Sequence, residues 1–271
     1  MSRPLLVVDG DSLAHRAYHG IPKSVNLNAV VGFTNMLVRL WESEQPRAVL
    51  VGWDTLTVPT YRHEALAGYQ AGRVFDQSLL DQLDMLPELV HAFGFAAAKG
   101  DGYEADDFLG AAVRFEEERG GTAVVATSDR DSFQLVSDRT TVITPVRGVS
   151  ELARIGPAEV RERYGVEPAQ VPDFIALRGD PSDRIPGAPG VGPKTAASIL
   201  NQYGSLDAAF EAGRFPNLRE ELELYRRIAT LDASAPLPPL QDQSPAWAEA
   251  SSLLDSWGLG NLAGRIAARS A

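Results

Sequence analysis

Acidic residues gather in five short segments of the chain, and several of them directly follow an apolar run. The segments read V-V-D-G, G-W-D, Y-E-A-D-D, T-S-D-R-D and R-G-D-P-S-D, and they contain the candidate metal ligands Asp9, Asp54, Glu104, Asp106, Asp107, Asp129, Asp131, Asp180 and Asp183. Two carboxylates about 4 Å apart repel by roughly 4 kcal/mol, even at an effective dielectric constant near 20. Either these segments stay apart in the fold, or cations hold them together.

The available donor atoms restrict which cations would bind. The chain has no cysteine, and its four histidines show no metal-ligand spacing. Carboxylate oxygens select hard ions such as Mg²⁺ or Mn²⁺. Two such ions about 4 Å apart activate a water and stabilise the leaving oxygen of a phosphodiester. We therefore predict a site for two divalent cations, and we assign Asp11 and Asp138 to the larger class of cap and turn residues.

The elements that must position these acids follow from the apolar pattern. Continuous apolar runs predict buried parallel strands at 5–8, 48–51, 123–126 and 141–143, and helices are expected at 28–42, 78–93 and 105–119. Such alternation is typical of an α/β fold, in which ligands gather at the carboxyl ends of the strands. The acids follow those ends. Helices and turns dominate from about residue 157, including a last helical stretch around 246–256.

The start of the predicted helix 105–119 leaves one point open. Helical spacing puts Glu104 and Asp107 on one side. Asp106 joins them only if Glu104 lies just before the first turn. In either case the acids crowd a helix N-terminus, where the helix dipole favours negative charge.

A glycine- and proline-rich segment, residues 179–193, leads into a predicted helix. Pro193 suits a first helical position, Gly204 a helix stop, and a second helix follows at 206–212. The loop between would present backbone N–H groups to a phosphate, and the candidate residues are Gly190, Gly192, Lys194 and Thr195. A nucleotide-binding P-loop is the weaker alternative because Pro193 interrupts its motif. A glycine-rich turn without a ligand is the other.

The bulk composition is that of an ordinary globular chain of 271 residues, 44% hydrophobic and 23% charged. Its net charge of −11 argues by itself against nucleic acid, since binding proteins usually carry a basic face. Cations held in a carboxylate cluster would offset part of that charge locally. No apolar run has membrane-spanning length and the first residues meet an acid too early for a signal peptide, so we expect a cytoplasmic protein without membrane contact.

Five stretches occur in a fixed order from residue 7 to about residue 196. They read V-V-D-G-D-S-L-A-H-R-A-Y-H, T-Y-R-H-E, Y-E-A-D-D, T-S-D-R-D-S-F-Q-L-V-S-D and R-G-D-P-S-D-R-I-P-G-A-P-G-V-G-P-K-T-A-A. Together they resemble the bacterial 5′-nuclease or flap-endonuclease family, which is related to the 5′–3′ exonuclease domain of DNA polymerase I. No polymerase sequence follows, so we expect a stand-alone member.

The resemblance implies a PIN-like nuclease core with a parallel central sheet flanked by helices. The core would span residues 1–170 and include a helical arch or clamp at about 55–85. Residues 171–271 would hold a helix–three-turn–helix, at about 183–203, and the C-terminal helices. The resemblance further implies that the helix–three-turn–helix grips duplex phosphates around a K⁺ ion.

The resemblance also implies roles for the acids and for three arginines. The first divalent ion would be held by Asp9, Asp54, Glu104 and Asp106, and the second would be held or surrounded by Asp107, Asp129, Asp131, Asp180 and Asp183. Arg16, Arg62 and Arg73 match positions that meet substrate phosphates, Arg16 and Arg73 next to the reacting group. Two residues depart from the pattern: Gln70 replaces the lysine of the Y-K-A-x-R arch motif, and Arg184 stands where asparagine is common.

We therefore expect a monomeric nuclease that hydrolyses DNA at 5′ single-strand/duplex junctions, RNA-primed ends included, by a two-metal-ion mechanism in replication or repair. Gln70 and the acidic balance keep a second hypothesis open, namely a DNA-junction-binding protein with weak catalysis. A third is a small-molecule phosphohydrolase in which Asp9 of the D-G-D motif is the nucleophile.

Overall fold

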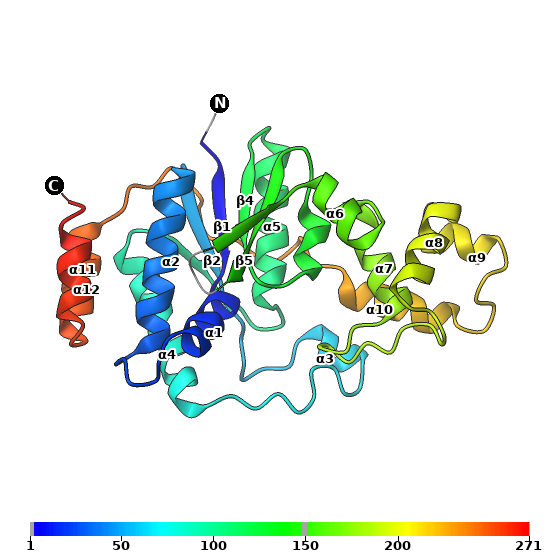
Figure 1. Ribbon diagram of the computed structural model, residues 1–271, viewed down its shortest axis with the longest axis horizontal. Coiled ribbons are helices and arrows are strands. Elements are labelled where there is room, and N and C mark those ends of the chain that lie inside the picture. Colours follow the sequence, from blue (N-terminus) through cyan, green and yellow to red (C-terminus); the bar gives the residue numbers. More distant parts are fainter. Residues whose placement is uncertain (1–2, 148–150, 271) are drawn as a thin grey trace.

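The computed structural model describes residues 3–147 and 151–270, and a six-stranded sheet lies at its centre (Figure 1). The strands lie in the order β3-β2-β1-β4-β5-β6, with the bounds β1 Leu5–Asp9, β2 Ala48–Gly52, β3 Ala96–Ala98, β4 Ala123–Ala126, β5 Thr140–Arg147 and β6 Glu151–Ile155. The first five in this order are parallel, and β6 pairs antiparallel with β5. The predicted α/β fold with a parallel sheet is confirmed.

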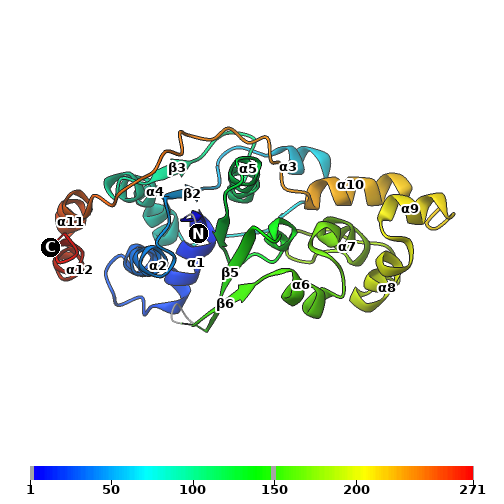
Figure 2. The same ribbon diagram turned by 90° about the horizontal axis from the view of Figure 1, so that it is seen from above.

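Each face of the sheet is covered by helices because its strands are apolar on both sides. Leu6 and Val8 belong to a core shared with α1 (Gly10–Gly20), α2 (Asn28–Glu44) and α4 (Gln77–Ala92). Leu5 and Val7 belong to a second core, which includes α5 (Ala105–Glu118) on the other face (Figure 2). The sequence predicts four of the six strands. It does not reveal β3, which is three alanines, or the alternating β6.

The order of the strands reverses at β1. The chain continues from β1 to β2 and β3 on one side, and then crosses to β4 and β5 on the other. Ligand sites of open α/β sheets lie beyond the carboxyl ends of the strands at such a reversal. Asp9 ends β1, Asp54 follows β2 by two residues, and Asp129 follows β4 by three.

The helices after β6 extend one of the two cores rather than building a separate one. They are α6 (Pro157–Tyr164), α7 (Val171–Arg178), α8 (Pro193–Tyr203), α9 (Leu206–Glu211) and α10 (Arg219–Ala229). Ile175, Leu200 and Ile228 join the same apolar cluster as Leu5 and Val7. The predicted helices at 193–203 and 206–212 are present, and α8 and α9 lie furthest from the sheet (Figure 1).

The last two helices return to the other end of the molecule. α11 (Trp247–Ser256) and α12 (Gly260–Ala267) pack in the core that contains α2 and α4, far from α8 and α9 (Figures 1 and 2). The structure therefore separates the C-terminal helices from the helix–three-turn–helix region with which we expect them to group. The boundary at residue 170 stays a prediction. None of the helices in the described residues is long and apolar enough to cross a membrane.

The segment expected to form a helical arch is mostly not helical. Within 55–85 the helices are α3 (Tyr61–Ala65) and the first half of α4, and they are joined by turns and an extended stretch over 66–76. Gly68 and Gly72 adopt left-handed backbone conformations in this stretch, as does Gln70 with φ of 49°. The stretch runs below the carboxyl ends of the strands in the view of Figure 1.

Candidate active site

Acidic side chains line one cavity of about 510 Å³, which we call the acidic pocket, and most of them lie at or just after the carboxyl ends of β1, β2 and β4 or at the start of α5. Its carboxylates belong to Asp9, Asp11, Asp54, Glu104, Asp106, Asp129 and Asp183. Six of the nine predicted ligands therefore lie around a single space. The gathering follows from parallel pairing, because the acids that end β1, β2 and β4 must emerge at the same edge of the sheet.

Hydrogen bonds hold the first acids in place. Asp9 accepts the Ser12 N–H at 2.9 Å and the Thr127 hydroxyl at 2.7 Å, one on each carboxylate oxygen. Each oxygen keeps a second lone pair for a further ligand. Thr127, at the end of β4, is thus a positioning residue that the sequence pattern does not single out.

Asp11 differs from the cap or turn role that we assign to it. It is buried in the first turn of α1, it lines the acidic pocket, and its carboxylate accepts the Asp54 N–H at 2.7 Å. Asp54 in turn accepts the Ala105 N–H at 2.7 Å, so that β2 is tied to the start of α5. These elements touch closely: a Cβ on Gly52 would lie 2.6 Å from the Ala105 carbonyl oxygen. The D-G-D spacing was the available signal for Asp11.

The start of α5 settles how its three acids are arranged. Glu104 is the N-cap and Ala105 the first helical residue, which is the condition for Asp106 to join Glu104 at the pocket. Oδ1 of Asp106 is buried and has no hydrogen-bond partner among the described residues. The nearest cation is the guanidinium of Arg62, whose Nη2 lies 3.6 Å from that oxygen.

Asp107 points away from the pocket, contrary to its predicted role as a metal ligand. It is fully buried, and its carboxylate pairs with both terminal nitrogens of Arg62 at 2.6 and 2.8 Å. It also accepts the N–H groups of Glu104 and Asp232 at 3.0 and 2.7 Å. All of its strong acceptor positions are therefore used within the protein.

Arg62 is likewise not the surface arginine that we expect to meet DNA. Its side chain is 1% exposed and also donates from Nε to the Ile228 carbonyl oxygen at 2.9 Å. A buried carboxylate and a buried guanidinium need each other, since either charge alone would be costly to desolvate. The pair joins α3, α5 and the end of α10.

The remaining acids come from two loops. Asp129 accepts the Asp131 N–H at 2.9 Å, and Asp131 begins a short 3₁₀ helix, Asp131–Leu135. Asp180 and Asp183 belong to the turn after α7, where Asp180 accepts the Ser182 N–H at 2.7 Å. Asp131 and Asp180 are buried beside the acidic pocket rather than on its wall. This turn requires glycine: a Cβ on Gly187, at φ of 74°, would lie 2.4 Å from the Gly179 nitrogen.

The carboxylates perturb one another. Burial raises the pKa of Asp9 to about 7, although hydrogen bonds from Thr127 and Ser12 oppose the change. Burial also raises the pKa of Glu104 to about 7 against the attraction of Arg62. The pKa values of Asp106 and Asp131 lie well above their usual range, because of burial and then of neighbouring charges. Such a cluster holds protons unless cations replace them.

The stretch 66–76 closes over these acids through two side chains. Gln70 donates from Nε2 to Asp183 Oδ1 at 3.1 Å and to Glu104 Oε2 at 3.5 Å. Arg73, 41% exposed, forms an ion pair with Asp183 at 2.9 Å. Gln70 thus links the start of α5 to the turn after α7 across the pocket, and Arg73 adds a second contact to that turn. Arg16 lies on α1, directly after the pocket residue His15.

The acidic pocket suits hard divalent cations by its chemistry. Its donors are carboxylate oxygens, their pKa values are raised by burial and mutual repulsion, and Asp106 offers a buried oxygen without a hydrogen bond. Among residues 3–147 and 151–270, no three acidic or histidine side chains already converge as a metal-binding group. The carboxylates therefore line the walls of the cavity and would have to draw inward around an ion.

A second, basic cavity of about 740 Å³ lies beside α8. Four cationic residues line it, namely Arg130, Arg163, Arg178 and Lys194, and no acid does. Arg130 stands between Asp129 and Asp131, and Arg178 lies two residues before Asp180. The segments that place acids at the acidic pocket therefore also place Arg130 and Arg178 at the basic cavity. Of these four residues only Lys194 is predicted from the sequence; the available signal for Arg130 and Arg178 was the arginine within T-S-D-R-D and R-G-D, and no motif marks Arg163.

The predicted phosphate-binding loop before α8 also borders the basic cavity, which Lys194 lines. Gly190, Gly192, Lys194 and Thr195 are all exposed, and a Cβ on either glycine would meet only open space. Two tyrosines near these segments are not available to stack on bases, since Tyr18 and Tyr69 are buried in the protein. Tyr61 donates to the Thr230 carbonyl oxygen at 3.2 Å.

A parallel sheet with carboxylates at its strand reversal, joined to a helical region with a basic cavity, is the arrangement expected of a nuclease. Family models identify it: residues 4–165 match the 5′–3′ exonuclease N-terminal resolvase-like domain, and residues 166–248 match the 5′–3′ exonuclease C-terminal SAM fold. The chain belongs to the 5′–3′ exonuclease family, as its motifs predict.

Curated relatives are DNA polymerases I. The protein from Mycobacterium leprae is 44% identical over 210 residues, which cover 74% of this chain and 23% of that protein. The one from Bacillus caldotenax is 37% identical over 240 residues, or 85% of this chain and 27% of that protein. The chain thus spans about a quarter of the length of these relatives.

Solved structures share the fold over nearly the whole chain. A T5 5′-exonuclease with bound zinc superposes with a TM-score of 0.74 at 19% identity, and the match covers 97% of this chain and 98% of that one. The catalytic core of Rad2 in complex with a DNA substrate superposes with a TM-score of 0.62 at 16% identity, covering 98% and 91%.

Proposed function

We propose that this chain is a 5′–3′ exonuclease and structure-specific 5′ flap endonuclease that hydrolyses DNA phosphodiesters with divalent cations. The acidic pocket carries this proposal, because seven carboxylates around one cavity would repel one another unless cations neutralise them. The family supports the reaction class, and the T5 relative with bound zinc supports the use of divalent ions.

In the proposed site, Asp9, Asp54, Glu104 and Asp106 hold one cation, and Asp129, Asp131, Asp180 and Asp183 hold or surround a second. When bound, the two cations activate water and stabilise charge on the phosphate. Mg²⁺ and Mn²⁺ both suit oxygen donors. Asp107 has no place in this set, because Arg62 occupies it.

The chain's own cations would position the substrate. Arg73 is exposed at the rim of the acidic pocket and would bind a phosphate there once divalent ions relieve its ion pair with Asp183. Arg16, on α1, is the second arginine proposed near the reacting phosphate.

Duplex DNA would be bound outside the acidic pocket, at the loop before α8 and at the basic cavity. Gly190, Gly192, Lys194 and Thr195 would contact backbone phosphates together with the basic cavity, and backbone carbonyls of this loop would hold K⁺. The net charge of −11 is compatible with this interaction, since four cationic residues line one cavity without an acid among them. We further propose a monomer in the cytoplasm that accepts 5′ junctions, RNA-primed ends included.

The decisive experiment uses a 5′-labelled flap substrate with Mg²⁺, Mn²⁺ or a chelator, and it maps product lengths. Asp129→Asn and Asp131→Asn should abolish cleavage while junction binding persists. Full cleavage by both variants would count against the two-ion assignment.

Gln70 supports the competing hypothesis of a junction-binding protein. Its neutral amide bridges Glu104 and Asp183, where a cationic side chain would attract the phosphate. Tight flap binding without any cleavage, with either ion from pH 7 to 9, would favour that hypothesis. Phosphate release from a generic phosphomonoester, with DNA left whole, would instead select a small-molecule phosphohydrolase.

A further inference from the structure

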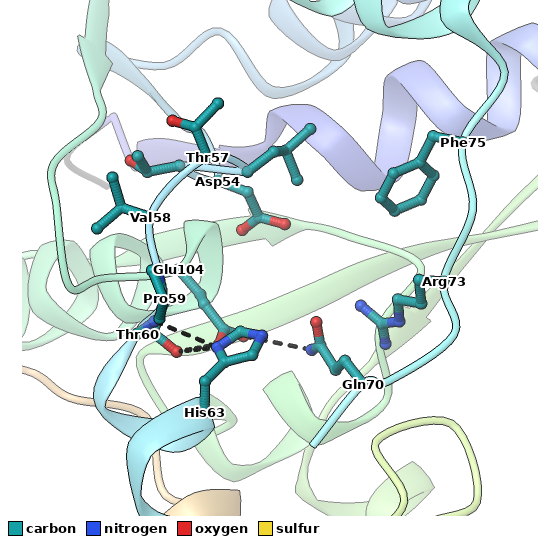
Figure 3. Close-up of a pocket in the computed structure, with 12 residues that line it drawn as sticks. Asp54, Thr57, Val58, Pro59, Thr60, His63, Gln70, Arg73, Phe75 and Glu104 are labelled. Atoms are coloured by element: carbon teal, nitrogen blue, oxygen red, sulfur yellow. Dashed lines mark hydrogen bonds between the residues drawn. The ribbon is translucent and has the colours of Figure 1, made fainter. Parts of the chain in front are cut away.

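A third pocket, of about 310 Å³, adjoins the acidic pocket, and we call it the side pocket. It lies between residues 54–60 and residues 70–75, which face each other in Figure 3, with Glu104 and His63 at its base. It shares five lining residues with the acidic pocket, which are Asp54, Gln70, Arg73, Phe75 and Glu104. A ligand whose phosphate lies at the acids would therefore place a neighbouring group in the side pocket.

One wall of the side pocket is apolar although it faces solvent. Leu56 is 45% exposed and Val58 is 37% exposed, and both line it together with Pro59. Across the described residues, four large aliphatic side chains are this exposed, and three of them border the side pocket or the acidic pocket: Leu56, Val58 and Val74. Single exposed apolar residues are ordinary, but their concentration at one place indicates a contact surface.

The opposite wall is an aromatic ring. Phe75 is half-buried and is held by an edge contact with His15, with ring centroids 5.0 Å apart. In Figure 3 its ring faces the segment that carries Thr57 and Val58 across the pocket. A fixed ring opposite an aliphatic wall suits a flat, uncharged group.

Polar groups at the base of the side pocket favour a neutral ligand over an anion. Asp54 and Glu104 form part of this base, and they would repel a phosphate that entered without cations. His63 accepts the Thr60 N–H on Nδ1 at 3.2 Å, which assigns the ring proton to Nε2. The amide of Gln70 adds a hydrogen-bond donor and acceptor. A nucleobase has the matching properties: a flat apolar face and a neutral polar edge.

The position of the side pocket suits the single-stranded part of a substrate. The side pocket shares five lining residues with the acidic pocket and none with the basic cavity, whose Arg130 directly follows the acidic-pocket residue Asp129. We propose that the side pocket binds the base of the unpaired nucleotide that flanks the scissile phosphate, stacked on Phe75. This proposal rests on the proposed function, which brings the phosphate to the acids and the duplex to the basic cavity.

The test combines abasic substrates with variants of Phe75. A labelled hairpin with a 5′ flap is prepared intact and with one abasic nucleotide at each position around the cleavage site. Binding is followed by fluorescence anisotropy in chelator, and cleavage by single-turnover rate with Mg²⁺. Stacking on an aromatic ring predicts about a 5- to 100-fold loss at one abasic position.

Phe75→Ala should cause the same loss on the intact flap and no further loss on the flap that is abasic at that position. Phe75→Leu should lie between Phe75→Ala and the wild type. Val58→Ala should weaken the same step, whereas Val25→Ala, equally exposed at 38% but outside both pockets, should not. Losses that are independent of abasic position, or an unaffected Phe75→Ala, would overturn the proposal.

The two proposals fail in different ways. If the wild-type chain binds the flap without cutting it, the hydrolytic function fails, and the anisotropy measurements still decide the side pocket. If it cuts the flap but no abasic position depends on Phe75, the side pocket fails alone.

Discussion

The buried pair between Arg62 and Asp107 allows a sharp test of which acids are structural. Replacing Arg62 by methionine keeps much of the side-chain volume but leaves the fully buried Asp107 carboxylate without its partner. Breaking a buried ion pair in this way costs about 3–5 kcal/mol. At roughly 2–4 °C per kcal/mol for a chain of this size, the melting temperature should fall by about 6–20 °C.

Asp107→Asn should be at least as damaging, because that carboxylate also accepts two backbone N–H groups. The double variant should lose less than the sum of the two single losses, since both remove the same ion pair. Calorimetry in chelator measures these losses without any contribution from cations. Arg114→Met is the matched control, because its ion pair with Glu118 is largely exposed and contributes less than about 1 kcal/mol.

An Arg62→Met protein with the melting temperature of the wild type, but with weaker and salt-dependent DNA binding, would contradict a structural role for Arg62. That result would indicate that Arg62 lies at the surface and that Asp107 is available to bind a cation. The adjacent acid should behave differently. Asp106→Asn should keep nearly the wild-type melting temperature in chelator, and it should bind Mn²⁺ more weakly in a calorimetric titration.

Three further predictions concern the acids and the basic cavity. The pKa values of Asp9 and Glu104 are raised on folding, so their stabilising contribution is present near pH 4 and lost as pH rises through about 7. Metal-free melting temperature should therefore decline less steeply with pH in Asp9→Asn than in wild type, and Mg²⁺ should stabilise the wild type more at pH 8 than at pH 5. Lys194→Ala should weaken flap binding and reduce the slope of log affinity against log salt by about one, which titrations at several salt concentrations would detect. Gln70→Lys should raise the metal-free melting temperature and the single-turnover cleavage rate, because its ammonium group would lie between Glu104 and Asp183. An unchanged rate would show that residue 70 does not help to bind the phosphate.

Local patterns were sufficient for the framework of the molecule. Four apolar runs predict four parallel strands, and the acids that follow three of them predict the edge of the sheet where a site lies, because strand pairing must bring those ends together. The glycine–proline segment predicts α8 because Pro193 and Gly204 act on the backbone next to them.

The sequence alone determined the fold class, the family and six of the seven carboxylates of the acidic pocket, since these depend on apolar periodicity and on motifs that are read along the chain. Only the tertiary structure decided which way each acid points. Asp106 and Asp107 are adjacent, yet one faces the acidic pocket and the other is held by Arg62, a residue 45 positions earlier in the chain. Asp11, and the apolar wall that faces Phe75, likewise acquire their surroundings from segments distant in sequence. Which partner a buried charge meets depends on packing between elements, and no local pattern records it.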